Sequence, residues 1–292
     1  MNRKSRGRLV GMAYLAPALL FVLVFTVYPL GQMVWMSLNN WSLIAPPKFV
    51  GLANYERAFG DRQFWVSFVF TLKYTAIITP VLIVGGYLLA LLTSQNTPLR
   101  RFTRTVVFIP VVIGLGVSSL LWYWLFNTDF GLVNESLLDL GLISEPVLWL
   151  GVDADRSNMA IIVSVVWKVI GFGMLLFVGA IQAVPTDVIE AAMVDGASYR
   201  QRVVGIILPL TLRTILMVTL VSMIGSLLAF DQFYLMTAGQ PHNETATSVF
   251  YVYLNSFPYL KLGYGAALSL ILTATILVFT IVQLFLTRLS RE

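Results

Sequence analysis

The sequence predicts an all-α integral membrane protein with six transmembrane helices. Hydrophobic residues make up 58% of its 292 residues and charged residues only 11%, whereas soluble domains carry about 25% charged residues. The apolar residues gather into six stretches, each longer than the ~20 residues that a helix needs to cross the ~30 Å hydrocarbon core of a bilayer. A soluble fold of this size could not cover so much apolar surface, so we expect the chain to lie in a membrane.

Each of these stretches is expected to form a helix. In hydrocarbon every backbone N–H and C=O group must be hydrogen-bonded within its own segment or in a closed barrel. The stretches are too long and too uniformly apolar for the alternating strands of a barrel. In chain order the predicted spans are Leu9–Leu30 or a little beyond, Phe64–Thr93, Thr105–Phe126, Met159–Val184, Thr214–Met236 and Gly263–Thr287.

The first span resembles a secretory signal peptide in two respects. Basic residues precede it, and Ala16-Pro17-Ala18 is similar to a cleavage site. The apolar run nevertheless continues well past that point, to Leu30 and beyond. We therefore expect a retained helix that follows a short cytoplasmic tail of residues 1–8.

The basic residues predict the orientation of the spans. Twelve of the 19 Lys and Arg residues lie on one side, five lie on the other, and Lys73 and Lys168 lie within spans. Because Lys and Arg accumulate in cytoplasmic loops, both termini are expected in the cytoplasm. The larger group is Arg3, Lys4, Arg6, Arg8, Arg100, Arg101, Arg104, Arg200, Arg202, Arg213, Arg288 and Arg291, and the smaller is Lys48, Arg57, Arg62, Arg156 and Lys261.

The composition also excludes several chemistries. The chain has no cysteine and a single histidine, His242, so it has no thiolate nucleophile and cannot build a multi-histidine metal site. The basic residues fall in short clusters between apolar stretches, which is the pattern of membrane orientation rather than of nucleic-acid binding. We expect no catalytic residue, no metal site and no nucleic-acid partner.

The most informative stretch is the segment Pro185–Pro209, which lies on the predicted cytoplasmic side between the fourth and fifth spans. Asp187 followed three residues later by Glu190 is the pattern of a capping box, which predicts that a helix begins there. Gly196 is suited to the left-handed conformation that ends a helix. The predicted helix has about two turns, too few to be stable alone, so neighbouring structure must hold it.

The composition of this short helix favours docking against another protein. Ala191 and Ala192 have very small side chains and let another backbone approach closely, while Glu190 and Asp195 offer carboxylates to cationic partners. A helix that merely rests on the membrane surface usually carries Lys, Arg and bulky apolar anchors. This helix carries acids and alanines instead.

These residues resemble a known family. Glu190-Ala-Ala-x-x-Asp195-Gly196-Ala197 followed by Ile206-x-Leu208-Pro209 is similar to the EAA loop of permease subunits in bacterial ABC importers. Further stretches resemble the carbohydrate-importer permeases of the maltose and glycerol-phosphate type, and the resemblance covers nearly the whole chain. These stretches are Phe49-Val-Gly-Leu-Ala-Asn-Tyr55, Asp61-x-x-Phe64-Trp65, Leu121-Trp-x-Trp-Leu-Phe-Asn127, Phe130-Gly-Leu-Val-Asn134 and Leu262-Gly-Tyr-Gly-Ala-Ala-Leu-Ser269.

The resemblance implies a type I ABC importer permease fold, with one transmembrane domain over residues 9–292 and the EAA loop at 185–212. It implies transport of a carbohydrate across the inner membrane by alternating access. It also implies four kinds of partner: an ATPase dimer that binds ATP and Mg²⁺, a second similar permease chain, an extracytoplasmic substrate-binding protein, and membrane lipid.

No cofactor is expected in this chain, because the sequence has no Gly-x-x-x-x-Gly-Lys-Ser/Thr loop to cradle phosphates. The energy must therefore come from the separate ATPase. By resemblance, the residues that couple this chain to the ATPase are Glu190, Ala191, Ala192, Asp195, Gly196, Ala197, Leu208 and Pro209.

A sugar path at membrane depth would need polar groups beside aromatic rings, since sugars bind through their hydroxyls and stack their C–H faces on rings. Ser222 and Ser226 lie four residues apart and so share one face of a helix. Packing between helices through small hydroxyls is the alternative. The candidates for the path are Trp167, Lys168, Gly171, Phe172, Ser222, Ser226, Phe230 and Asp231.

Three charged residues near the spans leave alternatives open. Lys168 is expected within the bilayer, where an ionisable group faces either a cavity or a structural ion partner. Lys73 can extend its ammonium to the membrane surface, because Tyr74–Ser94 spans the bilayer without it. Asp231 lies toward the outer end of the predicted fifth span, where it serves either as an interface anchor or in gating.

Two other classes of protein are weighed against this prediction. A secondary carrier, not driven by ATP, would rely on ion-coupling residues in its spans and often on an inverted repeat. A membrane-embedded enzyme would need clustered catalytic or metal-binding groups at depth. The spans have two lysines, no acid except Asp231 near one end, and no visible repeat, so the ATP-driven permease is favoured.

Overall fold

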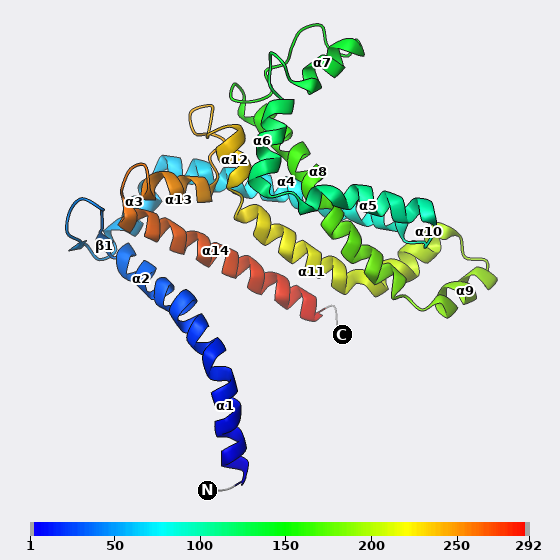
Figure 1. The fold of residues 1–292 in the computed structure, drawn as a ribbon, viewed down its shortest axis with the longest axis horizontal. Coiled ribbons are helices and arrows are strands. Elements are labelled where there is room, and N and C mark those ends of the chain that lie inside the picture. The colour runs from blue at the N-terminus through cyan, green and yellow to red at the C-terminus, as the bar shows by residue number, and fades with distance from the viewer. Residues whose placement is uncertain (1–2, 290–292) are drawn as a thin grey trace. The chain divides into compact units, whose positions relative to one another are not determined.

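The computed structural model describes residues 3–289 and divides the chain into two compact units. The first unit comprises residues 1–61 and 252–274, and the second comprises residues 62–251 and 275–292. Figure 1 shows the chain as a set of long helices joined by short helices and loops. Each unit is described by itself below.

The first unit begins with one continuous helical segment. Helix α1 (Arg3–Val22), a π-helical turn η1 (Leu23–Val27) and α2 (Tyr28–Ser37) follow one another without a break (Figure 1). The predicted first span is therefore confirmed as a helix. It starts at Arg3, within the segment expected to be a tail, and runs on to Ser37.

The loop that follows α2 is held by buried polar side chains. A short antiparallel pair, β1 (Asn39–Asn40) and β2 (Lys48–Phe49), precedes α3 (Ala53–Gly60). The Asn54 amide donates to the carbonyls of Ser37 (2.8 Å) and Asn39 (3.0 Å). The Tyr55 hydroxyl lies 2.8 Å from the Ser37 hydroxyl. Because both residues belong to the Phe49–Tyr55 motif, that motif fixes how the chain leaves its first span.

Four long helices build the second unit. Helix α4 (Arg62–Thr93) packs along α8 (Ala154–Gln182), and α5 (Pro98–Val112) and α11 (Leu208–Leu227) pack against this pair (Figure 1). One core cluster centres on Tyr74, Ile78 and Phe233, and a second centres on Tyr87, Met174 and Phe177. The predicted second and fourth spans are thus confirmed as helices.

The predicted third span is wrong as a single straight helix. The chain breaks after Val112, and α6 (Leu115–Leu125) departs from α5 at an angle of 100°. Pro110 and Gly114 flank this bend, and both residue types disfavour an uninterrupted helix. Helix α6 packs instead against α12 (Asp231–Met236).

The predicted fifth span also has different limits. The helix begins at Tyr199 with α10 (Tyr199–Arg202), continues through the π-helical turn η2 (Val203–Ile207) and ends at Leu227 with α11. The Thr247 hydroxyl donates to the Ala229 carbonyl (2.7 Å) just beyond that end, where this carbonyl has left the helical ladder. Phe230 and Asp231, which were expected on the fifth span, therefore lie in the break and at the start of α12.

The remaining helices are α7 (Leu132–Asp139), α9 (Thr186–Val194), α13 (Ser248–Ser256) and α14 (Leu262–Leu289), the last of which confirms the predicted sixth span. Within residues 3–289, five helices are long and apolar enough to cross a membrane, or six if the bent pair α5–α6 counts as one span. The predicted number of six spans is reached only if that bent pair is counted as one span.

Candidate functional site

Helix α9 carries the predicted coupling residues and is exposed along its length. Figure 1 shows it projecting beyond the ends of α8 and α11. All of α9 belongs to the described part of the chain, and no residue in it is buried. Val194 is 88% exposed and Met193 is 53% exposed. Glu190, Ala191 and Ala192 therefore lie on a helix that is open to a partner.

The C-terminal end of α9 is a Schellman motif, as its sequence predicts. Gly196 has a φ of +79°, which an L side chain rarely adopts. Its N–H donates to the Met193 carbonyl (3.1 Å), and the Ala197 N–H donates to the Ala192 carbonyl (2.9 Å). The expectation that Gly196 ends this helix in the left-handed conformation is confirmed.

The N-terminal end of α9 differs from the predicted capping box. Pro185 is the residue before the helix, and it provides no side-chain cap. Asp187 lies in the first turn, where a carboxylate is still favoured by the helix dipole. The capping box is found one helix later, where the Ser198 N–H donates to the Gln201 side chain (2.7 Å) and the Gln201 N–H to the Ser198 hydroxyl (3.4 Å).

The remaining coupling residues follow this helix in the chain. Asp195 is the residue after α9, Ala197 follows Gly196, and Leu208 and Pro209 form the first turn of α11. Two contacts hold the neighbouring ends of the long helices together: Gln182 donates to the Ser94 carbonyl (2.7 Å), and Arg104 donates to the carbonyls of Thr93 and Gln95 (2.8 Å each). These hydrogen bonds hold together the helix ends from which α9 projects.

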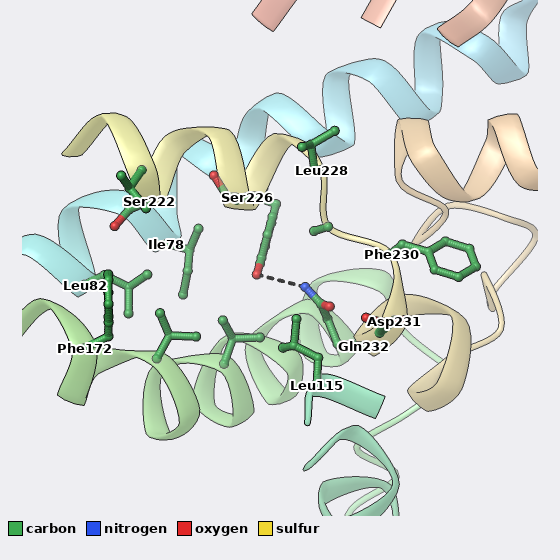
Figure 2. A pocket seen from close by; sticks show the side chains of 16 residues that line it. Ile78, Leu82, Leu115, Phe172, Ser222, Ser226, Leu228, Phe230, Asp231 and Gln232 are labelled. Atoms are coloured by element: carbon green, nitrogen blue, oxygen red, sulfur yellow. Dashed lines mark hydrogen bonds between the residues drawn. The ribbon is translucent and has the colours of Figure 1, made fainter. Parts of the chain in front are cut away.

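A second candidate site is a cavity of about 240 Å³ between α4, α8, α11 and α12. Figure 2 shows Ser222 and Ser226 on α11, Phe172 on α8, and Asp231 and Gln232 at the start of α12. Five of the eight predicted path residues therefore meet in one cavity, namely Phe172, Ser222, Ser226, Phe230 and Asp231.

Two further polar residues of this cavity were not among the predicted path residues. Tyr74 of α4 and Gln232 of α12 both line it, and the Gln232 amide donates to the Tyr74 hydroxyl (3.4 Å). Their side chains are 1% and 5% exposed. The polar residue Gln232 next to Asp231 was the only local signal for this pair.

The other three predicted path residues lie outside the lining of the cavity. The Trp167 ring packs edge-to-face on Trp122, with 5.7 Å between ring centroids. The Lys168 ammonium donates to the Val111 carbonyl (3.2 Å). A Cβ on Gly171 would overlap the Val107 carbonyl oxygen, so α5 and α8 are in close backbone contact there.

Lys168 thus takes neither of the two roles left open for it, since it faces a backbone carbonyl rather than the cavity or an acid. Its partner carbonyl lies at the C-terminal end of α5, just before the 100° bend. A cation is favoured there by the helix dipole and by carbonyls that have no partner within the helix. Lys168 stabilises the broken end of α5.

Replacing Lys168 with Met should therefore lower stability and leave substrate selectivity unchanged. A hydrogen bond from a charged group contributes about 1.5–3 kcal/mol, so we expect a clear fall in the melting temperature of the detergent-purified chain. Lys73→Met is the matched control, because Lys73 is exposed and its loss should leave the melting temperature near that of the unchanged chain. Normal melting combined with lost substrate uptake in Lys168→Met would contradict this role.

The described residues include no cluster of metal-ligating side chains. Within residues 3–289, no group of three or more His, Cys, Asp or Glu side chains is placed to hold a metal ion. The two sites are therefore an exposed helix outside the spans and a mixed polar and aromatic cavity between them. This arrangement defines a membrane transport component.

Comparison with known proteins identifies the family. Residues 82–292 match the family described as the binding-protein-dependent transport system inner membrane component, and this chain belongs to that family. It is 33% identical over 290 residues to the trehalose/maltose transport system permease protein of Thermococcus litoralis, covering 99% of this chain and 97% of the relative. It is 31% identical to the lactose transport system permease protein of Rhizobium radiobacter, covering 95% and 94%.

Solved structures share the fold. A chain in the crystal structure of a bacterial alginate ABC transporter, in complex with an alginate pentasaccharide-bound periplasmic protein, superposes with a TM-score of 0.85. The two sequences are 21% identical, and the match covers 96% of this chain and 94% of that one. This chain is therefore the permease component of an ABC importer by family, and its fold is that of the solved transporter chain.

Proposed function

We propose that this chain is the permease subunit of an ATP-driven importer of a carbohydrate. The observation that carries the proposal is the cavity at membrane depth, whose lining combines the aromatic residue Phe172 with the polar residues Ser222, Asp231 and Gln232. Phe230 also lines the cavity, and its ring is stacked on Tyr234. Aromatic faces with a few convergent hydrogen-bonding groups suit the alternating C–H and hydroxyl faces of a sugar. The sugar names borne by the relatives support the same class.

Energy for transport comes from a separate ATPase dimer, which binds ATP and Mg²⁺. Helix α9 docks on that dimer, with Ala191 and Ala192 allowing close approach and Glu190 offering a carboxylate. The absence of buried residues in α9 supports this role, because a helix of about two turns that buries no residue would not be stable alone. A second similar permease chain completes the pore, and an extracytoplasmic binding protein delivers the sugar.

The orientation follows from the distribution of basic residues. Both termini and α9 lie in the cytoplasm, since Arg200, Arg202 and Arg213 flank the same membrane side as the basic clusters at residues 3–8 and 100–104. The cavity then lies between this side and the outer loops, where alternating access requires it.

The experiment that tests the proposal is uptake by proteoliposomes that contain the assembled transporter. We expect uptake of at least one of maltose, trehalose and lactose that requires ATP on the ATPase side and a binding protein on the other. Sugar uptake driven by an ion gradient without ATP would establish the alternative, a secondary carrier. ATP-dependent uptake of amino acids with no uptake of any sugar would refute the carbohydrate class.

Shortening Phe172 to Ala should weaken the interaction with the sugar. An aromatic stacking contact contributes about 0.5–1.5 kcal/mol, so we expect the apparent KM for uptake to rise by roughly threefold to tenfold. The matched control is Phe102→Ala on α5, whose ring is 67% exposed and lies outside the cavity. Equal effects of the two substitutions would show that the Phe172 ring does not contact the sugar.

A further inference from the structure

Two arginines converge in a pocket at the base of α9. The pocket has a volume of about 420 Å³. Arg100 comes from the first turn of α5, and Arg202 from the last residue of α10. We call this site the arginine pocket; its lining is Leu91, Leu92, Ser94, Gln95, Arg100, Ile181, Ile189, Tyr199, Arg202 and Ile207.

The positive charge of the arginine pocket is not neutralised by the described part of the chain. The Nε atom of Arg202 is buried, with no hydrogen-bond partner among the described residues. Among the residues that line this pocket none is Asp or Glu, and Glu190 lines only the neighbouring pocket. Leaving a buried donor of a charged group unpaired is costly, so the pocket is suited to a ligand that supplies acceptor oxygens and negative charge.

The chemistry of the arginines limits which ligands can bind in this pocket. A guanidinium presents a planar fork of N–H donors that matches the oxygens of phosphate and carboxylate. Gln95 and Tyr199 add further polar groups to the same lining. Two cations with two neutral donors form a typical phosphate site.

The walls of the pocket limit the choice of ligand further, because half of the lining residues are aliphatic. Leu91 and Leu92 lie in the last turn of α4, Ile181 lies in the last turn of α8, and Ile207 belongs to η2. A free inorganic anion gains nothing from such walls, whereas an amphiphile places its acyl chain there. Basic pockets between transmembrane helices on the cytoplasmic side are suited to anionic lipid head groups.

We propose that the arginine pocket binds the phosphodiester head group of an anionic phospholipid from the cytoplasmic leaflet. Arg100 and Arg202 hold the phosphate, and the aliphatic wall holds the upper part of an acyl chain. Because Ile189 of α9 and Tyr199 of α10 also line the pocket, the bound lipid contacts the coupling segment directly. The lipid then steadies the base of α9 when the ATPase moves it.

The test is lipid retention by the purified, assembled transporter, measured by mass spectrometry after exchange into equal amounts of phosphatidylglycerol and phosphatidylcholine. A basic residue near an anionic surface contributes about 1 kcal/mol, which is about fivefold in affinity. We expect Arg100→Gln and Arg202→Gln each to lower the retained phosphatidylglycerol by about fivefold. Arg202→Lys, which keeps the charge but loses the fork, should fall between them and the unchanged chain.

The matched control is Arg200→Gln, which removes the same charge from an exposed residue of α10 that does not line the pocket. We expect it to retain phosphatidylglycerol like the unchanged chain. Equal losses in Arg200→Gln and Arg202→Gln would overturn the proposal, as would equal retention of the two lipids by the unchanged chain. Displacement of phosphatidylglycerol by inorganic phosphate alone would assign the pocket to a free anion instead. If Arg202→Gln does not fold, Arg100→Gln decides the question.

Discussion

Reversing the charge of Glu190 to Lys should abolish sugar uptake while the chain still inserts into the membrane. Glu190 lies on the exposed helix α9, so its replacement disturbs no packing within the chain. The substitution does place a cation where the carboxylate would bind the proposed ATPase surface. Losing a central interface contact commonly weakens binding by about tenfold or more. The measurements are uptake and ATP hydrolysis by the assembled transporter in proteoliposomes, where we expect the two to become uncoupled.

Gly196→Pro should have the same consequence through the backbone. Proline holds φ near −65° and has no N–H, whereas Gly196 has a φ of +79° and donates to the Met193 carbonyl. The end of α9 must therefore change direction, and the coupling surface changes with it.

Each of these substitutions has a matched control at the C-terminal end of α7. Asp139→Lys makes the same kind of charge reversal at an exposed acid. Gly141→Pro disrupts the same motif, because Gly141 has a φ of +67°, donates to Leu138 and is followed by a Leu142 N–H that donates to Leu137. Both controls should keep ATP-coupled uptake. Normal uptake in Glu190→Lys and Gly196→Pro would refute the docking of α9 on the ATPase.

Among the glycines of α8, Gly171 should be the one whose replacement by Ala is most destabilising. The new Cβ would overlap the Val107 carbonyl oxygen of α5 and lie 3.0 Å from the Phe108 Cα. Backbone cannot move aside as a flexible side chain can, so the two helices must separate. Overpacking of this kind costs about 1–3 kcal/mol, and we expect a matching fall in the melting temperature of the purified chain.

The control for this substitution lies two turns further along the same helix. A Cβ on Gly179 meets no atom within 4 Å, and alanine is favoured over glycine inside a helix by about 1 kcal/mol. Gly179→Ala should therefore melt at or slightly above the temperature of the unchanged chain. If Gly171→Ala also melts there, α5 and α8 are not in close contact at this point.

The limits of these predictions from sequence are clearest at α9. Its length and its end at Gly196 could be predicted, because a left-handed C-terminal residue is a local requirement that glycine meets. Its start could not, because Asp187-x-x-Glu190 and Ser198-x-x-Gln201 both fit the capping pattern. Only the structure shows that the second pattern is used as a capping box.

The breaks in the spans were missed for a different reason. The residues from 214 to 236 are predominantly apolar, so hydropathy alone predicts one helix. The break after Leu227 coincides with a hydrogen bond from Thr247 to the Ala229 carbonyl, which joins residues 18 positions apart. Contacts of this kind depend on tertiary structure and leave no periodic signal.

The residues of the cavity also divide into those that local spacing predicts and those that only tertiary contacts bring together. Ser222 and Ser226 share a helix face, which spacing predicts, and both line the cavity. Tyr74 and Gln232 are 158 residues apart and meet only in the folded chain. Lys168 could be recognised as a cation at membrane depth, but its partner depends on the bend after α5, which the composition does not reveal.

The uninterrupted helix from Tyr199 to Leu227 joins the two candidate sites with a single stiff rod. Its 29 residues extend over about 43 Å at about 1.5 Å per residue, with the turn after α9 at one end and Ser222 and Ser226 near the other. A tilt of about 10° about one end shifts the opposite end by about 7 Å over that length. In the proposed function, a small displacement of the α9 end of this helix, driven by the ATPase, is large enough to open or close a path the width of a sugar ring at the cavity.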